Sequence, residues 1–246
     1  MIEPLLKETA DQFWHAAGIS PTFPRELERA VAWVMPIAIL KIPNLWTRDV
    51  EDCLRRRQLP LLSVTEDRPL HGCVYAYAGK GLIIVNGTDE IDELRFTIAH
   101  ELAHFLLNYQ VPRNRAIDKL GPEITDVLDG LRAARTIERV DAVLSGVLLG
   151  IYSHFMHRED VKDGSTIVAA ESRADRLAVE LLAPEEAVRR LLPRGFYDRT
   201  FQRRVGSLRR LLKMRFGLPR SVAASLASRI CREWFGGPSA REWLGL

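Results

Sequence analysis

The spacing of apolar residues between Leu94 and Leu107 is the clearest structural pattern in the chain. Apolar side chains recur there three or four positions apart, at Phe96, Ala99, Leu102, Ala103 and Leu106. That spacing places them on one face of an α-helix and predicts a helix over the whole segment. Ala170–Ala183 is predicted to form another helix, and Pro184 suits the first turn of the next one, where a missing amide proton leaves no hydrogen bond unmade.

Short runs rich in β-branched and aromatic residues precede the first of these helices and predict a small sheet. Three runs are expected to be its strands: Leu61–Val64, Gly72–Tyr77 and Leu82–Asn86. Further upstream, Phe23–Leu59 has a helical pattern interrupted by prolines, and it includes a predicted helix over Trp46–Leu54 that is capped by Thr47.

The second half of the chain is predicted to be helical. Between Val111 and Ala170, apolar residues at helical spacing predict at least two helices, one of which includes Val140–Phe155. Beyond Arg190, the helices are divided by turns at Gly195, at Gly217-Leu218-Pro219 and at Gly236-Gly237-Pro238. The expected fold class is therefore α+β, with a mainly helical core, a small three-stranded sheet and a helical C-terminal module.

The composition is that of a soluble globular protein. The 246 residues are 47% hydrophobic and 27% charged, and no apolar run reaches the roughly 18 to 20 residues of a membrane-spanning helix. The first residues lack the basic and then apolar stretch of a secretory signal, so a cytoplasmic location is expected. Cys53, Cys73 and Cys231 are widely spaced, which predicts reduced thiols rather than disulfides or a Cys-x-x-Cys metal site.

The sequence His100-Glu101-Leu102-Ala103-His104 lies inside the first predicted helix and carries candidate chemistry. Residues four apart lie one above the other on a helix, so His100 and His104 can direct two imidazole nitrogens at one metal ion. Glu101 is the next residue round the helix. From there its carboxylate reaches a water bound to that metal and can act as general base for attack on a peptide carbonyl. The pattern predicts a peptidase that uses Zn2+, although Mn2+, iron and cobalt accept the same ligands.

A catalytic zinc site needs a third protein ligand, and the predicted helix Ala170–Ala183 offers one. Glu171 and Asp175 are four residues apart and share a face of that helix. We expect Glu171 to bind the metal and Asp175 to accept the outer N–H of a ligand histidine, which fixes the tautomer of the imidazole. On its own this pair would indicate only a solvated helix face, but a preceding His-Glu-x-x-His helix reverses that interpretation.

Both segments resemble the signature of the ImmA/IrrE metallopeptidases. Arg95–Leu107 looks very like the catalytic helix of that family. Glu171–Pro184 resembles its downstream Glu-x-x-Ala-(Asn/Asp)-x-Phe-Ala-x-x-Leu-Leu-Met-Pro segment, with Leu177 and Ala183 in place of Phe and Met. The strand before the catalytic helix also fits, so the resemblance covers roughly Asp49–Arg190.

The resemblance implies a zincin-like peptidase core in which His100, His104 and Glu171 are the metal ligands and Glu101 is the catalytic residue. Known members of the family cleave helix-turn-helix repressors and thereby release stress or transfer genes. A specific transcriptional regulator is therefore the implied protein substrate.

The connection between His104 and Glu171 is longer than in that family. The expected domains are residues 1–190 as the peptidase domain, with a helical insertion at about 110–168, and residues 191–246 as the C-terminal module. The insertion is either a lid or substrate-docking surface, or an extra helix packed on the core. Tyr152, His154 and His157 within it are candidates for a transition-state hydrogen bond, but we favour ordinary surface or core positions for them.

Charge is distributed unevenly along the chain. Residues 189–246 contain about 14 Lys or Arg against about 3 Asp or Glu, which leaves the rest near −8 within a total of +3. Arg203–Phe216 interleaves cations with apolar residues and predicts a basic amphipathic helix. Leu208–Ile230 has the form of a helix-turn-helix that contacts DNA, and a solvated helical cap that docks an acidic partner is equally compatible with the sequence.

Together these patterns predict a metal-dependent endopeptidase that cleaves a specific protein, by resemblance a helix-turn-helix repressor. Two alternatives stay open. One is a regulator that binds DNA or a partner through its basic tail and uses the peptidase fold as a scaffold. The other is the toxin of a toxin–antitoxin pair.

Overall fold

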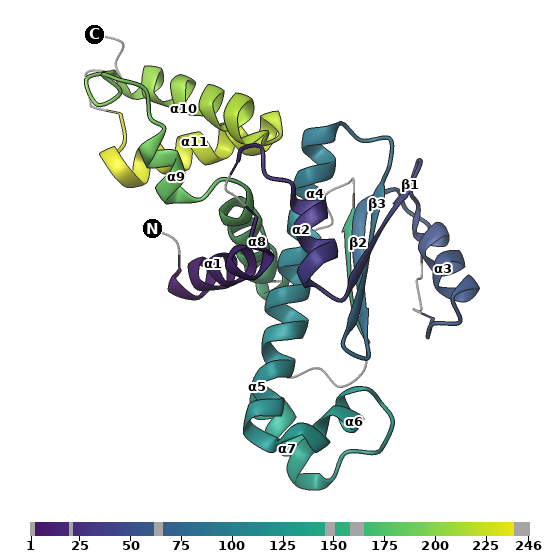
Figure 1. The fold of residues 1–246 in the computed structure, drawn as a ribbon. Coiled ribbons are helices and arrows are strands. Elements are labelled where there is room, and N and C mark those ends of the chain that lie inside the picture. Colours follow the sequence, from purple (N-terminus) through teal and green to yellow (C-terminus); the bar gives the residue numbers. More distant parts are fainter. Residues whose placement is uncertain (1–2, 20–21, 62–65, 146–150, 158–164, 239–246) are drawn as a thin grey trace.

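The protein combines a four-stranded mixed sheet with helices in an α+β arrangement (Figure 1). The computed structural model describes residues 3–19, 22–61, 66–145, 151–157 and 165–238, and for 141–145 and 165–168 it describes the backbone alone. The strands are β1 (Ile37–Ile42), β2 (Leu70–Tyr77), β3 (Lys80–Asn86) and β4 (Tyr152–His157), in the spatial order β1-β3-β2-β4. β1 runs parallel to β3, and β2 is antiparallel to both of its neighbours.

Helices make up most of the rest of the described chain. They are α1 (Pro4–Ala17), α2 (Leu27–Val34), α3 (Thr47–Arg56), α4 (Ile91–His104), α5 (Val111–Leu120), α6 (Thr125–Leu128), α7 (Thr136–Ser145), α8 (Ser165–Leu182), α9 (Glu185–Arg190), α10 (Phe201–Phe216) and α11 (Arg220–Phe235). A π-helical stretch, Phe105–Gln110, joins α4 to α5, and a short 3-10 helix, Pro122–Ile124, precedes α6. Among the described residues, no helix has both the length and the apolar character needed to cross a bilayer.

The two faces of the sheet bury different side chains, because successive residues of a strand point to opposite sides. One face contributes to the main core, together with α1, α2, α4 and α8, through Val74, Ala76, Ile83 and Val85. The other face packs on α3 in a smaller core through Cys73, Tyr75, Leu82 and Ile84. Figure 1 shows the same arrangement, with α4 along one face of the sheet and α3 on the other.

Helix α4 is enclosed between the sheet and α8. Every residue from Phe96 to His104 is buried. A helix that is buried on all sides normally carries apolar side chains, and buried ionisable groups need partners. The three ionisable residues of this stretch, His100, Glu101 and His104, therefore mark it as a place where polar groups from other elements converge.

Helices α5, α6 and α7 form a lobe that extends beyond the end of α4 (Figure 1). This lobe has a small core of its own, formed by Ala116, Ile124, Val127 and Leu128. An ion pair between Arg113 and Asp129, 2.7 Å long and largely buried, fastens α5 to the end of α6. The predicted insertion therefore contains more than one helix, as expected. Of the predicted helix Val140–Phe155, however, residues 146–150 lie outside the described part of the chain, and β4 returns to the main sheet.

The C-terminal helices α10 and α11 lie side by side as a hairpin (Figure 1). Gly217 ends α10 with a φ of +66°, a conformation that glycine adopts readily, and its carbonyl accepts a hydrogen bond of 3.0 Å from Arg95 at the start of α4. The buried residues of both helices belong to the same core as α4 and α8; they include Leu208, Leu212, Phe216, Ala223, Leu226 and Ala227. The expected domain boundary at residue 190 thus crosses one continuous core.

The structure confirms the α+β class but corrects the strand count from three to four. Ile37–Ile42, predicted within a helical region, is β1, because prolines on both sides isolate a short Ile-rich run that pairs with β3. Tyr152–Phe155, predicted as the end of a helix, belongs to β4. Of the predicted strand Leu61–Val64, residues 62–64 lie outside the described part of the chain, and Leu61 is not in a strand.

The predicted helix over Trp46–Leu54 is confirmed as α3, but its cap was assigned one residue too late. Trp46 is the residue before the helix, and its backbone N–H donates to the carboxylate of Asp49 over 2.8 Å. Thr47 is the first helical residue, and its hydroxyl donates to the carbonyl of Glu66 instead.

Candidate metal centre

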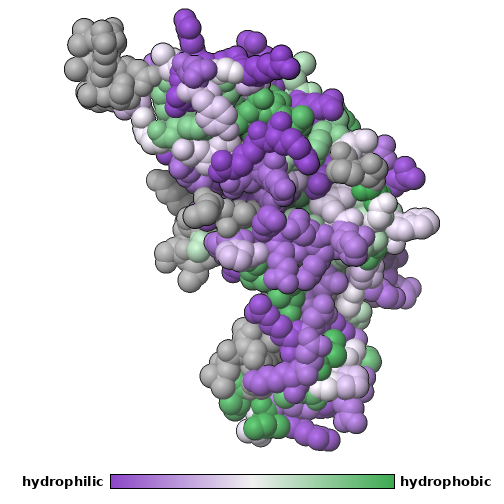
Figure 2. Space-filling model, turned by 60° about the vertical axis from the view of Figure 1, so that its left-hand side comes forward, coloured by the Kyte–Doolittle hydropathy of each residue, from purple (hydrophilic) through white to green (hydrophobic). Residues whose placement is uncertain are grey.

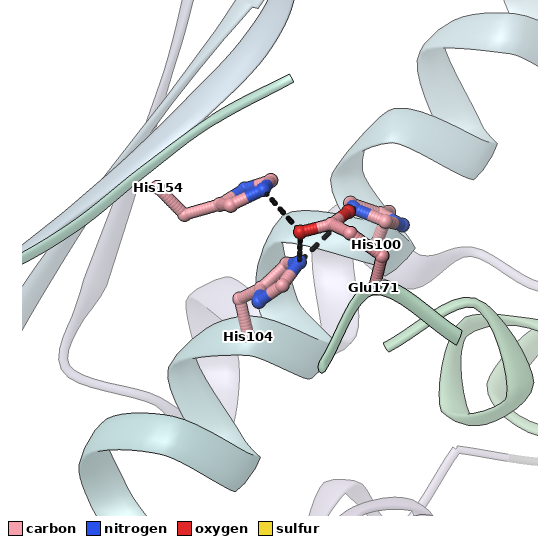
Figure 3. A group of neighbouring side chains, drawn as sticks. All are labelled: His100, His104, His154 and Glu171. Atoms are coloured by element: carbon pink, nitrogen blue, oxygen red, sulfur yellow. Dashed lines mark hydrogen bonds and ion pairs between the residues drawn. The ribbon is translucent and has the colours of Figure 1, made fainter. Parts of the chain in front are cut away.

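Side chains from three elements converge on one point beside α4 (Figure 3). His100 and His104 come from α4, His154 from β4 and Glu171 from α8. One potential ligand atom of each of these four residues lies within 4.8 Å of all the others. The fold therefore brings together the three ligands predicted from the sequence, and it adds a histidine to them.

His100 and His104 present the same ring nitrogen to the shared centre. Their Nε2 atoms are 3.1 Å apart, and the two residues are only 2% and 1% exposed. Burial acts to lower the pKa of each ring. At His100, hydrogen bonds to Asp175 and Glu171 outweigh it and raise the pKa to about 10. At His104 the burial prevails, helped by the nearby His154, so its pKa lies below the ordinary value.

The outer nitrogens of both rings have protein partners, which hold Nε2 toward the centre. Nδ1 of His100 lies 2.9 Å from Oδ1 of Asp175, the contact expected from the sequence. Nδ1 of His104 lies 3.2 Å from the hydroxyl of Tyr152 and 3.0 Å from the side-chain amide of Asn108. A proton on Nδ1 leaves a lone pair on Nε2, and this is the tautomer that binds a metal through Nε2.

Asn108 reaches His104 from the π-helical stretch that follows α4. Its amide also donates to the hydroxyl of Tyr152 on β4, over 3.0 Å. Local widening of this kind within a helix is frequent at functional sites. Here it places a side chain four residues after His104 where it can link the helix to the strand.

Glu171 completes the group from α8. Its carboxylate oxygens lie 3.3 Å from Nε2 of His100, 3.5 Å from Nε2 of His104 and 2.9 Å from Nε2 of His154. Burial by itself would raise the pKa of Glu171, but the hydrogen bonds from the three imidazoles lower it well below its usual range. The carboxylate is therefore ionised and can act as an anionic ligand.

Glu101 is completely buried and has one carboxylate oxygen without a partner. Its Oε2 lies 3.0 Å from Nδ1 of His154, whereas Oε1 has no hydrogen-bond partner among the described residues. A buried polar atom of this kind is unfavourable unless some further group satisfies it. Its position next to the converging histidines is where a water molecule or a cation would do so.

His154 belongs to this group, although we favoured an ordinary position for it from the sequence. It lies between the two carboxylates, with Nδ1 toward Glu101 and Nε2 toward Glu171, and its ring stacks on that of His104 at 3.7 Å. Burial acts to lower the pKa of His154, but the two carboxylates raise it to about 9. The error came from placing Tyr152–Phe155 in a helix, since the alternation along a strand directs Tyr152 and His154 to the same face.

This donor set fits a divalent cation. Two imidazoles and one carboxylate are the protein ligands of a common class of catalytic zinc site. The outer nitrogens of His100 and His104 already have protein partners, as in such sites. The same donors accept other divalent metals, so the arrangement indicates a metal site without identifying the metal.

A pocket of about 320 Å³, lined mainly by apolar side chains, lies next to the centre and includes Asp175 in its wall. Phe96 lies one helical turn before His100, Val179 one turn after Asp175, and Met156 two residues after His154 on the same side of β4; all three line the pocket. The opposite wall comes from α11, through Val222, Ser225, Leu226 and Arg229. The C-terminal hairpin therefore helps to form a pocket that reaches Asp175, the partner of the outer nitrogen of His100.

The other histidines of the described chain do not join the cluster. His71, for example, pairs with Asp89 over 2.8 Å near the start of α4. A scan against models of protein families finds no match for this chain, and a search of curated proteins finds no significant match. The resemblance to the ImmA/IrrE group thus rests on the two motifs alone.

Proposed function

We propose that this protein is a metal-dependent endopeptidase that resembles the ImmA/IrrE group. The observation that carries the proposal is the convergence of His100, His104 and Glu171 beside Glu101, whose second carboxylate oxygen is buried without a partner. Three protein ligands with a neighbouring carboxylate are what metal-assisted peptide hydrolysis requires.

His100, His104 and Glu171 would hold the ion, for which Zn2+ is the favoured candidate and Mn2+ or another divalent metal an alternative. When bound, such an ion acts as a Lewis acid toward a peptide carbonyl and lowers the pKa of water. Asp175 accepts the Nδ1 proton of His100, and the hydroxyl oxygen of Tyr152 is placed to accept that of His104. Asn108 positions the hydroxyl by donating to it.

Glu101 acts as the general base. It takes a proton from the attacking water and passes it to the amine that leaves when the peptide bond breaks. Protonated His154 keeps its Nδ1–H on Glu101, whereas its Nε2–H faces Glu171 over 2.9 Å. When Glu171 binds the ion, that Nε2–H would turn to the oxygen of the scissile carbonyl and donate a hydrogen bond as negative charge develops there. Each of these protons therefore has a donor and an acceptor among the chain's own residues and its substrate.

The substrate would be a specific protein that presents an apolar side chain. The pocket beside the cluster has walls of Phe96, Met156, Val179 and residues of α11. Burying a Leu- or Phe-sized side chain there favours binding by about 1.5–3 kcal/mol. By resemblance to the family, the proposed substrate is a helix-turn-helix transcriptional repressor.

The test compares the zinc-loaded wild type with Glu101→Gln. Each protein is incubated with a cell extract, and new protein N-termini are identified by mass spectrometry. Because the amide cannot accept the proton, Glu101→Gln should bind zinc normally and generate new termini roughly 10²- to 10⁴-fold more slowly. The matched control is Glu90→Gln, an exposed residue just before α4, which should cleave like the wild type.

Two outcomes of that experiment contradict the proposal. One is an equal set of new termini from Glu101→Gln and the wild type. The other is an absence of new termini from the zinc-loaded wild type, which would favour a protein that uses this fold as a scaffold for binding.

A further inference from the structure

Helix α10 carries a basic face that takes no part in the proposed peptidase chemistry. Six cationic side chains line a single hollow of about 720 Å³ on it: Arg199, Arg203, Arg209, Arg210, Lys213 and Arg220. Figure 2 shows strongly hydrophilic residues at the upper end of the molecule, where Figure 1 places α10 and α11. This surface is called the α10 basic face below.

The shape of the hollow follows from the sequence of α10. Arg203, Arg210 and Lys213 lie on one side of the helix, at spacings of seven and three residues. Between them on the same side are Gly206 and Ser207, and a side chain added at Gly206 would meet nothing within 4 Å. Two small residues flanked by long cationic ones form a floor with charged walls.

These cations lack the acidic partners that surface cations usually have. Within the described part of the chain, none of the six forms an ion pair with a carboxylate. Arg199 donates to the hydroxyl of Ser207, and five of the six side chains are exposed. Holding like charges together without counter-charges is unfavourable unless an anion is bound, so the face is suited to an anionic ligand.

The chemistry favours phosphate over carboxylate as the charge that is recognised. Five of the six cations are arginines, and the planar guanidinium donates two parallel hydrogen bonds to a phosphate group. Arg203 and Lys213 are separated by about 15 Å along the helix, a span that faces about four successive phosphates of one nucleic-acid strand. A single phosphate would use only a part of this face.

A protein partner is less well matched to the same surface. Stable protein interfaces centre on apolar and aromatic anchors. No aromatic residue lines the hollow, and its one large apolar residue is Met214. The absence of aromatic residues also removes the platform on which unpaired bases stack, which favours a duplex over a single strand.

The basic face and the apolar pocket use different helices of the hairpin. The pocket takes Val222, Ser225, Leu226 and Arg229 from α11. The basic face uses α10, Arg199 just before it and, from α11, Arg220 alone. The two sets share no residue. A ligand on the α10 basic face and a side chain in the pocket therefore do not compete for the same residues.

We infer that the α10 basic face binds the phosphate backbone of duplex nucleic acid without reading its sequence. The inference is independent of the proposed peptidase activity, since none of its residues touches the metal cluster. It would hold the protein close to other nucleic-acid-bound proteins.

The test is fluorescence anisotropy of the full-length protein with a labelled 20-base-pair DNA duplex of arbitrary sequence. About four to five phosphate contacts predict binding that is ~150- to 500-fold weaker at 200 mM than at 50 mM salt. The triple variant Arg203→Ala/Arg210→Ala/Lys213→Ala should bind at least about tenfold more weakly at 50 mM and show roughly a third of the salt slope. An RNA duplex of the same length identifies which nucleic acid supplies the phosphates, and tighter binding to either supports the inference.

The matched control is Arg55→Ala/Arg56→Ala/Arg115→Ala, which removes three exposed cations from α3 and α5. It should bind like the wild type. The inference is overturned if the control loses as much affinity as the α10 variant, if the wild type does not bind at 50 mM salt, or if polyglutamate of equal charge competes as well as DNA. The last result would assign the face to an acidic protein. Thermal unfolding of both variants, whose substitutions are all at exposed positions, verifies that they are folded.

Discussion

Among single residues, Glu101 could be placed in the cluster from the sequence, whereas His154 could not. The contact between His100 and His104, and the place of Glu101 beside them, follow from helix geometry alone. Five consecutive residues are therefore enough to predict these positions. Glu171 and Asp175 were found because they repeat the four-residue spacing on a second helix. His154 has no such spacing to the others, since only the pairing of β4 with β2 brings it to α4.

Replacing His154 distinguishes a hydrogen-bond donor to the substrate from a fourth metal ligand. If His154 donates a hydrogen bond to the reacting carbonyl, His154→Ala should keep its zinc affinity and lower kcat by about 10²- to 10³-fold, with little change in KM. Zinc content after dialysis and steady-state kinetics provide the measurement. Loss of the zinc together with activity would instead make His154 a fourth ligand.

Asp175 is expected to act through His100 rather than on the substrate. Asp175→Asn removes the acceptor that orients the imidazole, and such a change typically lowers metal affinity about 10- to 100-fold. Competition with a coloured zinc chelator measures the effect. Asp118→Asn, an exposed carboxylate on α5, is the control, and an equal loss of affinity there would contradict the role given to Asp175.

At the scale of elements, long amphipathic helices were predictable and short strands were not. The helices around the two motifs and the two C-terminal helices separated at Gly217 appear as expected, because each has several turns of apolar spacing. β1 and β4 have only six residues each, and a short apolar run does not by itself distinguish strand from helix. Whether these segments form strands depends on pairing with strands that are distant in the sequence.

Helix α4 carries both residues of the main core and residues of the metal cluster. Its buried apolar side chains therefore contribute to the free energy of unfolding. Leu102 lies between His100 and His104 in sequence and is completely buried. Leu102→Ala should lower the free energy of unfolding by about 2–5 kcal/mol, measured by urea denaturation. Ile91→Ala, on the same helix but 65% exposed, should change it by less than about 0.5 kcal/mol. Equal effects would mean that α4 is not packed as described.

Helix α11 is expected to set the size of the side chain accepted beside the cluster. In the zinc-loaded protein, a leucine-derived hydroxamate should bind about 10- to 100-fold more tightly than acetohydroxamate, since its side chain is buried. Ser225→Trp, which fills the pocket, should abolish that difference, whereas Ser221→Trp, on the same helix outside the pocket, should not. Isothermal titration calorimetry makes the comparison, and an unchanged preference in Ser225→Trp would contradict the assignment of the pocket.

For the whole molecule, the way in which the residues beyond 190 attach to the rest of the chain was the hardest feature to predict from the sequence. The sequence changes character near residue 190, because the cations concentrate beyond it, and charge is a property of the surface. Burial across that point is continuous, with Leu212, Phe216 and Leu226 in the same core as Leu177 and Leu181. Surface charge could therefore be predicted from composition, whereas the attachment of the module depended on side chains that only the fold brings together.

Zinc K-edge X-ray absorption of the zinc-loaded protein would show whether His100, His104 and Glu171 build a metal centre. We expect one zinc per chain with a shell of nitrogen and oxygen ligands at about 2.0–2.2 Å, including imidazoles, and no sulfur. A protein that retains no zinc after dialysis, or a sulfur shell at about 2.3 Å from the cysteines, would contradict it.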